Sequence, residues 1–91
     1  MHLKELQEVV RTSPVMSPNP FKNSLEIMLA ATEELGEVAQ EVALLESVGT
    51  KAGWEKEPST DRLGSEITNV INCLVALANY YDLDLEELYS E

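Results

Sequence analysis

Apolar residues recur at helical spacing in four segments of the chain. In the first segment, from Leu3 to about Arg11, they lie three and four residues apart, which predicts a short amphipathic helix. The three prolines between residues 14 and 20 cannot continue this helix, because proline has no backbone N–H to donate. A connector is therefore expected before the second segment.

The second segment predicts a long helix from Asn23 or Ser24, either of which is a suitable N-cap, to about Ser47. Two neighbouring stripes along it are largely apolar. The first consists of Leu25, Met28, Thr32, Leu35, Ala39 and Val42, and the second of Ile27, Ala31, Glu34, Val38, Glu41 and Leu45. Because the two stripes together are wider than one buried face, we expect neighbours on two sides, as in a bundle or an oligomer.

The third segment predicts another long helix, with Ser59, Thr60 or Asp61 as its cap and an end near Tyr81. The stripe expected to form its core contact consists of Leu63, Ile67, Val70, Leu74, Leu77 and Tyr81. A neighbouring stripe carries Glu66, Asn69, Cys73, Ala76 and Tyr80. The two long helices are expected to be antiparallel, joined by the loop over residues 48–59.

The fourth segment predicts a short helix over residues 85–89, with Asp84 as its N-cap. No stretch alternates apolar and polar residues between hairpin turns, so the predicted class is all-α. With 91 residues the chain is expected to be a single domain over residues 1–91, in which residues 1–22 form the first helix and the connector. A domain this small buries a limited core, which favours self-association.

Composition excludes several classes of protein. The 17 acidic and 6 basic residues give a net charge of -11, which disfavours binding to nucleic acid. One cysteine and one histidine exclude a disulfide scaffold, a zinc site of several His and Cys ligands, and a Ser-His-Asp triad. No apolar run is long enough for a membrane span or a signal peptide, so we expect a cytoplasmic protein without membrane contact.

Glu34 interrupts the second stripe of the first long helix, between Ala31 and Val38. Glu37 follows three residues later, so the two carboxylates can reach one point in space. Glu33 and Glu41 lie close enough to join them from either side. Acidic residues on an amphipathic helix are most often simply solvated, and this alternative stays open.

The second long helix repeats the feature with Glu66 and Asn69. If the two helices are antiparallel, four oxygen-bearing side chains converge inside a bundle. Gathered carboxylates repel each other and are costly to desolvate unless a proton or a cation neutralises them. Ligands that are all oxygen favour Mg²⁺, with Mn²⁺ as a substitute, and Mg²⁺ is commonly shared with substrate phosphates.

These motifs, in this order, resemble those of the MazG-like nucleoside triphosphate pyrophosphohydrolases, which belong to the all-α NTP pyrophosphatase superfamily. The resemblance covers about residues 25–89. It rests on Glu33-Glu34-Leu35-Gly36-Glu37, on Glu66-Ile67-Thr68-Asn69, and on Leu77-Ala78-Asn79 followed by Asp82-Leu83-Asp84-Leu85-Glu86-Glu87-Leu88.

The resemblance implies a four-helix-bundle protomer that assembles as a homodimer or homotetramer. The implied reaction is Mg²⁺-dependent hydrolysis of a nucleoside triphosphate to the monophosphate and pyrophosphate, in nucleotide pool cleansing. Glu34, Glu37 and Glu66 match the family's acidic metal ligands, and Glu33 matches the acidic residue beside them. A spare carboxylate, Glu33 or Glu37, would orient the attacking water, and Asn79 matches an asparagine that contacts substrate.

Asn69 departs from the family pattern, which has aspartate at this position. An amide carbonyl can still ligate Mg²⁺, but it brings no negative charge and cannot act as a base. The alternative is therefore a catalytically weak or inactive helical oligomer that binds nucleotide or a protein partner. A purely structural acidic bundle is a third alternative.

Residues around the loop between the long helices are candidates for substrate binding. Lys51, Lys56 and Arg62 are half of the cationic side chains and could contact the outer phosphates, or they could only keep the loop soluble. Trp54 could stack on a base or pack against a neighbouring protomer.

Overall fold

The computed structural model describes residues 1–13, 21–48 and 56–90. These ranges contain four helices, namely α1 (Leu3–Thr12), α2 (Ser24–Glu46), α3 (Thr60–Tyr80) and α4 (Leu85–Ser90). No strand occurs within them, which confirms the all-α prediction. None of the helices within these ranges combines the length and the hydropathy that a membrane span requires.

Three of the helices begin at the predicted caps. The side chain of Asn23 accepts a hydrogen bond from the backbone N–H of Glu26 at 3.0 Å, and so starts α2. The hydroxyl of Ser59 accepts one from the N–H of Arg62 at 3.1 Å and starts α3. Asp84 precedes α4 and accepts from the N–H of Glu87 at 3.1 Å. Local capping chemistry therefore fixes where these helices start.

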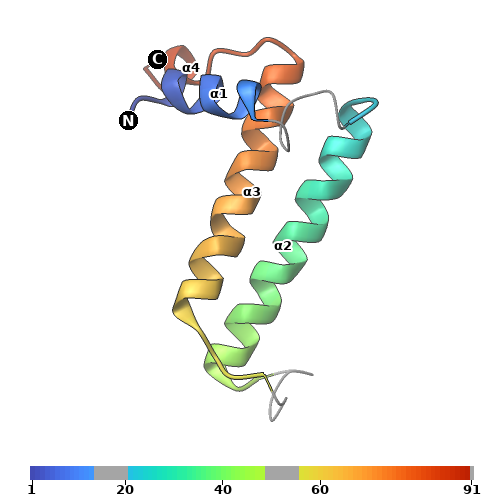
Figure 1. Cartoon of the computed structure of the whole chain (residues 1–91), viewed down its shortest axis with the longest axis vertical. Coiled ribbons are helices and arrows are strands. Elements are labelled where there is room, and N and C mark those ends of the chain that lie inside the picture. Colours follow the sequence, from blue (N-terminus) through green and yellow to red (C-terminus); the bar gives the residue numbers. More distant parts are fainter. Residues whose placement is uncertain (14–20, 49–55, 91) are drawn as a thin grey trace.

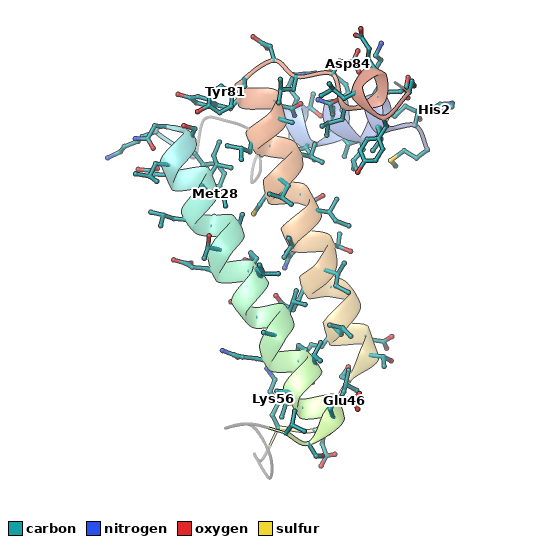
Figure 2. The ribbon with its side chains drawn as sticks, turned by 180° about the vertical axis from the view of Figure 1, so that it is seen from behind. His2, Met28, Glu46, Lys56, Tyr81 and Asp84 are labelled. Carbon is teal, nitrogen blue, oxygen red and sulfur yellow. The ribbon has the colours of Figure 1, made fainter. Side chains whose placement is uncertain are left out.

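In the part of the chain that the structure describes, two long and two short helices form a helical bundle. α2 and α3 run antiparallel beside each other over most of their length (Figure 1). α1 and α4 lie across the C-terminal end of α3 and contact each other. Lys56 and Glu46 mark the loop end of this α2–α3 hairpin, and Asp84 lies at the opposite end of the molecule (Figure 2).

The best-buried apolar cluster lies where α1 meets the two long helices. It consists of Val10, Ile27, Val75 and Ala76, against which Leu6, Phe21, Leu77 and Leu85 pack. Ile27 is 0% exposed. α1 therefore completes the core of the hairpin at one end only.

The prediction that one stripe of α3 forms its core contact is wrong at three of the positions in that stripe. Ile67 is 43% exposed, Leu74 is 47% exposed and Tyr81 is 58% exposed. The buried residues of α3 are Cys73, Val75, Ala76, Ala78 and Asn79. The reason is that α2 packs on the neighbouring stripe of α3, which carries Cys73 and Ala76, and α1 covers the next side.

On α2 the second of the two predicted stripes is the one that faces α3. Ile27, Ala31 and Glu41 are buried on this stripe, whereas Leu25 and Leu35 of the first stripe are exposed. The prediction was that α2 has neighbours on two sides. Within the chain, α3 covers one of these sides and the other has no neighbouring helix among the described residues. An apolar side of the hairpin remains exposed.

Candidate functional site

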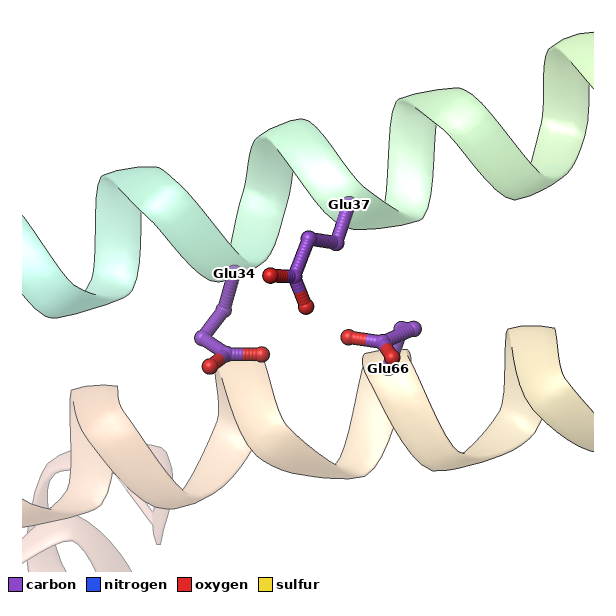
Figure 3. A group of neighbouring side chains, drawn as sticks. All are labelled: Glu34, Glu37 and Glu66. Atoms are coloured by element: carbon purple, nitrogen blue, oxygen red, sulfur yellow. The ribbon is translucent and has the colours of Figure 1, made fainter.

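Three carboxylates meet between the two long helices. Glu34 and Glu37 come from adjacent turns of α2, and Glu66 comes from the facing part of α3. One oxygen of each residue lies within 4.8 Å of the corresponding oxygens of the other two. Figure 3 shows the three side chains pointing toward one another, so the predicted convergence of these residues is confirmed. We call them the acidic group.

The carboxylates of the acidic group lie close enough to repel one another. A hydrogen bond with Glu66, together with repulsion from Glu34 and Glu66, raises the pKa of Glu37 to about 7. One oxygen of Glu34 and one of Glu66, Oε2 in each case, is buried without a hydrogen-bond partner among the described residues. Burying a carboxylate oxygen without a hydrogen-bond partner costs free energy, so a proton or a cation would stabilise the acidic group.

The donor set of the acidic group fits a hard divalent cation. It offers only carboxylate oxygens, the ligand type that Mg²⁺ and Mn²⁺ prefer. The unpartnered oxygens of Glu34 and Glu66 would gain a partner from such an ion. No softer ligand lies within the group, although Cys73 is buried nearby on α3.

Cys73 behaves as a core residue. Burial, with a smaller effect from the charge of Glu34, raises the pKa of its thiol above the ordinary value. A thiol with a raised pKa is a poor nucleophile and a poor metal ligand at neutral pH.

Glu41 does not join the acidic group, contrary to one expectation from its spacing. It is 4% exposed, and its Oε1 accepts from Nε of Arg62 at 3.0 Å while its Oε2 lies 3.5 Å from Nζ of Lys56. The hydrogen bond from Arg62, with the charges of Arg62 and Lys56, holds the pKa of Glu41 below its ordinary value. Glu41 is therefore neutralised within the chain.

The same contacts give Lys56 and Arg62 a structural role at the base of the hairpin. Arg62 links the start of α3 to α2 through Glu41, and it also donates to the backbone carbonyl of Glu57. Their contact with substrate phosphates stays a prediction. Lys51 and Trp54 lie outside the described residues.

Glu33 and Asn69 lie near the acidic group in sequence and are exposed. Glu33 is not among the three residues whose oxygens converge. Asn69 follows Glu66 by about one turn of α3, so its amide is on the same side of the helix. The roles predicted for both residues stay predictions.

Asn79 lies away from the acidic group, in a buried polar network with α1. Its Oδ1 accepts from Nε2 of Gln7 at 2.9 Å and from Nη2 of Arg11 at 3.3 Å. Its Nδ2 donates to the backbone carbonyl of Gln7 at 2.9 Å. The amide of Asn79 is thus engaged by α1.

Gln7, like Arg11, is a residue of this network that the sequence prediction missed. Its side chain is buried, donates to the carbonyl of Leu83 at 2.7 Å and accepts from the N–H of Leu85 at 3.0 Å. It therefore joins α1 to the turn between α3 and α4. The sequence pattern is consistent with a buried Gln7, because this residue lies on the apolar side of the first helix, four residues after Leu3 and three before Val10.

Comparison with known proteins adds no family to this description. No protein-family model, no curated protein and no solved structure matches the chain.

Proposed function

We propose that the protein is a Mg²⁺-dependent nucleoside triphosphate pyrophosphohydrolase of the MazG-like type. It would hydrolyse a ribo- or deoxyribonucleoside triphosphate to the monophosphate and pyrophosphate, in nucleotide pool cleansing. The observation that carries the proposal is the acidic group, because Glu34, Glu37 and Glu66 converge from two helices and match the acidic motifs of that family. The homodimer or homotetramer of the family is part of the same proposal.

Glu34, Glu37 and Glu66 would hold the metal, with Asn69 as a neutral fourth ligand. When bound, Mg²⁺ neutralises carboxylate and phosphate charge and polarises the phosphate oxygens. A cation is a condition for substrate binding here, because a chain with a net charge of -11 otherwise repels a triphosphate.

Water would attack the α-phosphorus in line, forming a new P–O bond while the bond to the oxygen that bridges the α and β phosphates breaks. Pyrophosphate leaves with that bridging oxygen. Glu37 is one carboxylate that would orient the water and accept its proton. Glu33 is the alternative carboxylate for orienting the water.

A second candidate function is that of a catalytically weak or inactive helical oligomer that binds nucleotide or a protein partner. Two observations favour it. Asn69 brings no charge to the acidic group, and the amide of Asn79 is occupied by Gln7 and Arg11. The amide of Asn79 is then unavailable for the substrate contact that the family resemblance implies, and Asn69 can act only as a neutral ligand.

Pyrophosphate release from a panel of canonical and modified nucleoside triphosphates, with and without Mg²⁺, tests the proposal. We expect Mg²⁺-dependent release from at least one of them. Stabilisation by nucleotide and Mg²⁺ without turnover would support the second candidate. No turnover together with an unchanged melting temperature would contradict both.

Asn69→Asp is expected to tighten Mg²⁺ binding by roughly tenfold, because affinity for hard cations follows the number of charged ligands. Isothermal titration calorimetry measures the change. Thr68→Asp is the matched control, since it adds the same charge to an exposed position one residue earlier, about 100° around α3. Equal effects of the two substitutions would remove Asn69 from the metal site.

Mg²⁺ affinity is expected to rise with pH between about 6 and 8. Glu37 has a pKa of about 7, so below this pH a proton must leave before its carboxylate can ligate the metal. The expected slope approaches tenfold per pH unit below pH 7 and flattens above it. Calorimetry in two buffers of different ionisation enthalpy measures the released proton, and an affinity independent of pH would exclude Glu37 as a ligand.

The stability of the metal-free protein is expected to change in the opposite direction. The pKa of Glu37 is raised from 4.5 to about 7 by folding, so the folded state binds the proton more tightly than the unfolded state. This contribution to stability is complete below about pH 4.5 and is lost as the pH rises through 7. Melting curves with a chelator present, for the wild type and Glu37→Gln, measure it, and only the wild type should show the loss.

A further inference from the structure

An ion pair joins the two long helices one turn away from the acidic group. Glu41 follows Glu37 by four residues on α2, and Arg62 precedes Glu66 by four residues on α3. Because the helices are antiparallel, both steps lead toward the loop end of the hairpin (Figure 1). Each step is about one helical turn, or about 6 Å along the axis. The Glu41–Arg62 pair therefore forms the layer next to the one in which Glu37 and Glu66 face each other (Figure 3).

The contact between Glu41 and Arg62 is close and largely shielded from water. Oε1 of Glu41 accepts from Nε of Arg62 at 3.0 Å and lies 2.9 Å from Nη2 of the same guanidinium. The side chain of Glu41 is 6% exposed and that of Arg62 is 33% exposed. Two guanidinium nitrogens on one carboxylate restrict both the distance and the direction of the contact, which a single ammonium does not. The pair therefore favours one separation of the two helices.

The acidic group has the opposite tendency. Its three carboxylates have oxygens within 4.8 Å of one another, and Glu66 reaches the other two from the facing helix. Repulsion between these charges favours a wider separation of α2 and α3 in the absence of a cation. A metal site binds tightly only if its ligands are held in place by surrounding contacts. The acidic group therefore needs a contact that opposes its own repulsion.

Apolar packing supplies that contact on one side of the acidic group only. Toward α1, Ala31 lies one turn before Glu34 and Cys73 lies two turns after Glu66, and both Ala31 and Cys73 are 4% exposed. Toward the loop, the two short helices give no cover, because they lie across the C-terminal end of α3. On that side the buried residues of α2 include Glu41, so the ion pair takes the place of apolar packing.

We propose that the Glu41–Arg62 pair positions the acidic group. By holding α2 and α3 together one turn away, it keeps the carboxylates of Glu37 and Glu66 within reach of one cation. Arg62 is thus a positioning residue for metal binding, which acts through the two helices and does not touch the ion. The inference rests on the metal site of the proposed function but not on the proposed hydrolysis.

Removing both charges of the pair separates positioning from simple electrostatics. The double variant Glu41→Gln with Arg62→Gln loses one negative and one positive charge from the same place, so the field at the acidic group changes little. Removing Arg62 alone would leave a buried unpaired carboxylate and endanger the fold, whereas two amides leave no unpaired charge. A fall in metal affinity of the double variant therefore reports a change in the geometry of the carboxylates.

Electron paramagnetic resonance of Mn²⁺ mixed with the full chain, without nucleotide, tests the proposal. We expect the double variant to bind Mn²⁺ about tenfold or more weakly than the wild type, as is usual when a residue that supports metal ligands is lost. Lys4→Gln with Asp84→Asn is the matched control. It removes an ion pair of 3.6 Å at the opposite end of the molecule and should leave the affinity unchanged (Figure 2).

Two single variants separate positioning from a general loss of stability. Gln7→Ala removes buried hydrogen bonds between α1 and the turn after α3, and below its melting temperature it should bind Mn²⁺ as the wild type does. Arg62→Lys keeps the positive charge without the two-nitrogen contact, so we expect a smaller loss of Mn²⁺ affinity than in the double variant. If circular dichroism shows that the double variant does not fold, Arg62→Lys decides.

The outcomes distinguish this inference from the proposed function. Equal Mn²⁺ affinity in the wild type and the variants of the pair would overturn the positioning role and leave the proposed function intact. Weaker nucleotide binding with unchanged Mn²⁺ affinity would overturn it too, and would assign Arg62 to the substrate phosphates. A wild type that binds no Mn²⁺ would overturn both. The expected loss of Mn²⁺ affinity, with no pyrophosphate release from any nucleotide, would support the positioning role and contradict only the proposed reaction.

Discussion

Glu37→Gln is expected to lower Mg²⁺-dependent pyrophosphate release by at least about 100-fold while the helical content stays unchanged. The substitution keeps the size of the side chain but removes both its charge and its ability to accept a proton. Loss of a ligand or of a general base commonly costs two or more orders of magnitude in rate. The measurement is kcat/KM for the best nucleotide, with circular dichroism as the check on folding.

The same substitution is expected to raise the melting temperature of the metal-free protein at pH 8. Three carboxylates lie within 4.8 Å of one another, and the amide removes one of the three mutually repelling charges. A loss of activity with a gain of stability cannot come from a folding defect, and it is the usual relation at a site built for function. Glu46→Gln, an exposed substitution at the end of α2, is the control and should change neither property.

Retained turnover in Glu37→Gln would remove Glu37 from the site. A loss in Glu33→Gln of equal size, with Glu37→Gln active, would assign the proton acceptor to Glu33. Loss of Mg²⁺ binding in Glu37→Gln, with no nucleotide hydrolysis by the wild type, would leave a metal site without the proposed reaction.

The starts of the helices could be predicted from the sequence because capping is local. Asn23, Ser59 and Asp84 each accept a hydrogen bond from an N–H three residues later, and nothing distant in the chain takes part. Three of the four helix starts among the described residues therefore follow from a few consecutive residues.

The buried side of α3 could not be predicted in the same way. Two neighbouring stripes both satisfy the helical period, one through Ile67 and Leu74 and the other through Cys73 and Ala76. Which of the two stripes is buried depends on where α2 and α1 pack, and the spacing of apolar residues does not determine this.

For charged residues, too, spacing along the sequence did not show which partners they would meet, as the acidic group and Glu41 illustrate. Glu34 and Glu41 both interrupt one apolar stripe of α2, and the pattern gives them equal standing. The structure separates them because Arg62, 21 residues from Glu41, neutralises that carboxylate, whereas Glu34 faces Glu66. Whether a buried carboxylate has a cationic partner depends on how the helices pair. Spacing along one helix therefore identified both carboxylates as candidates but could not show which of them belongs to the acidic group.

Asn79→Ala is expected to lower the free energy of unfolding by about 2 kcal/mol and the melting temperature by roughly 10 °C. The substitution removes three buried or partly buried hydrogen bonds that join α3 to Gln7 and Arg11 of α1. α1 supplies Val10 to the core, so its loosening also affects the apolar cluster. Thermal and urea unfolding measure the change.

The variant separates the two roles that Asn79 could have. A structural role predicts that Gln7→Ala has a similar effect, and that the double variant loses less than the sum of the single ones because both remove the same contacts. Asn72→Ala, at a half-buried position of the same helix, should leave stability nearly unchanged. If Asn79 contacts the nucleotide, its alanine variant raises KM at temperatures where the fold is intact, and Gln7→Ala does not. An unchanged melting temperature with a raised KM would mean that α1 releases the amide when substrate binds.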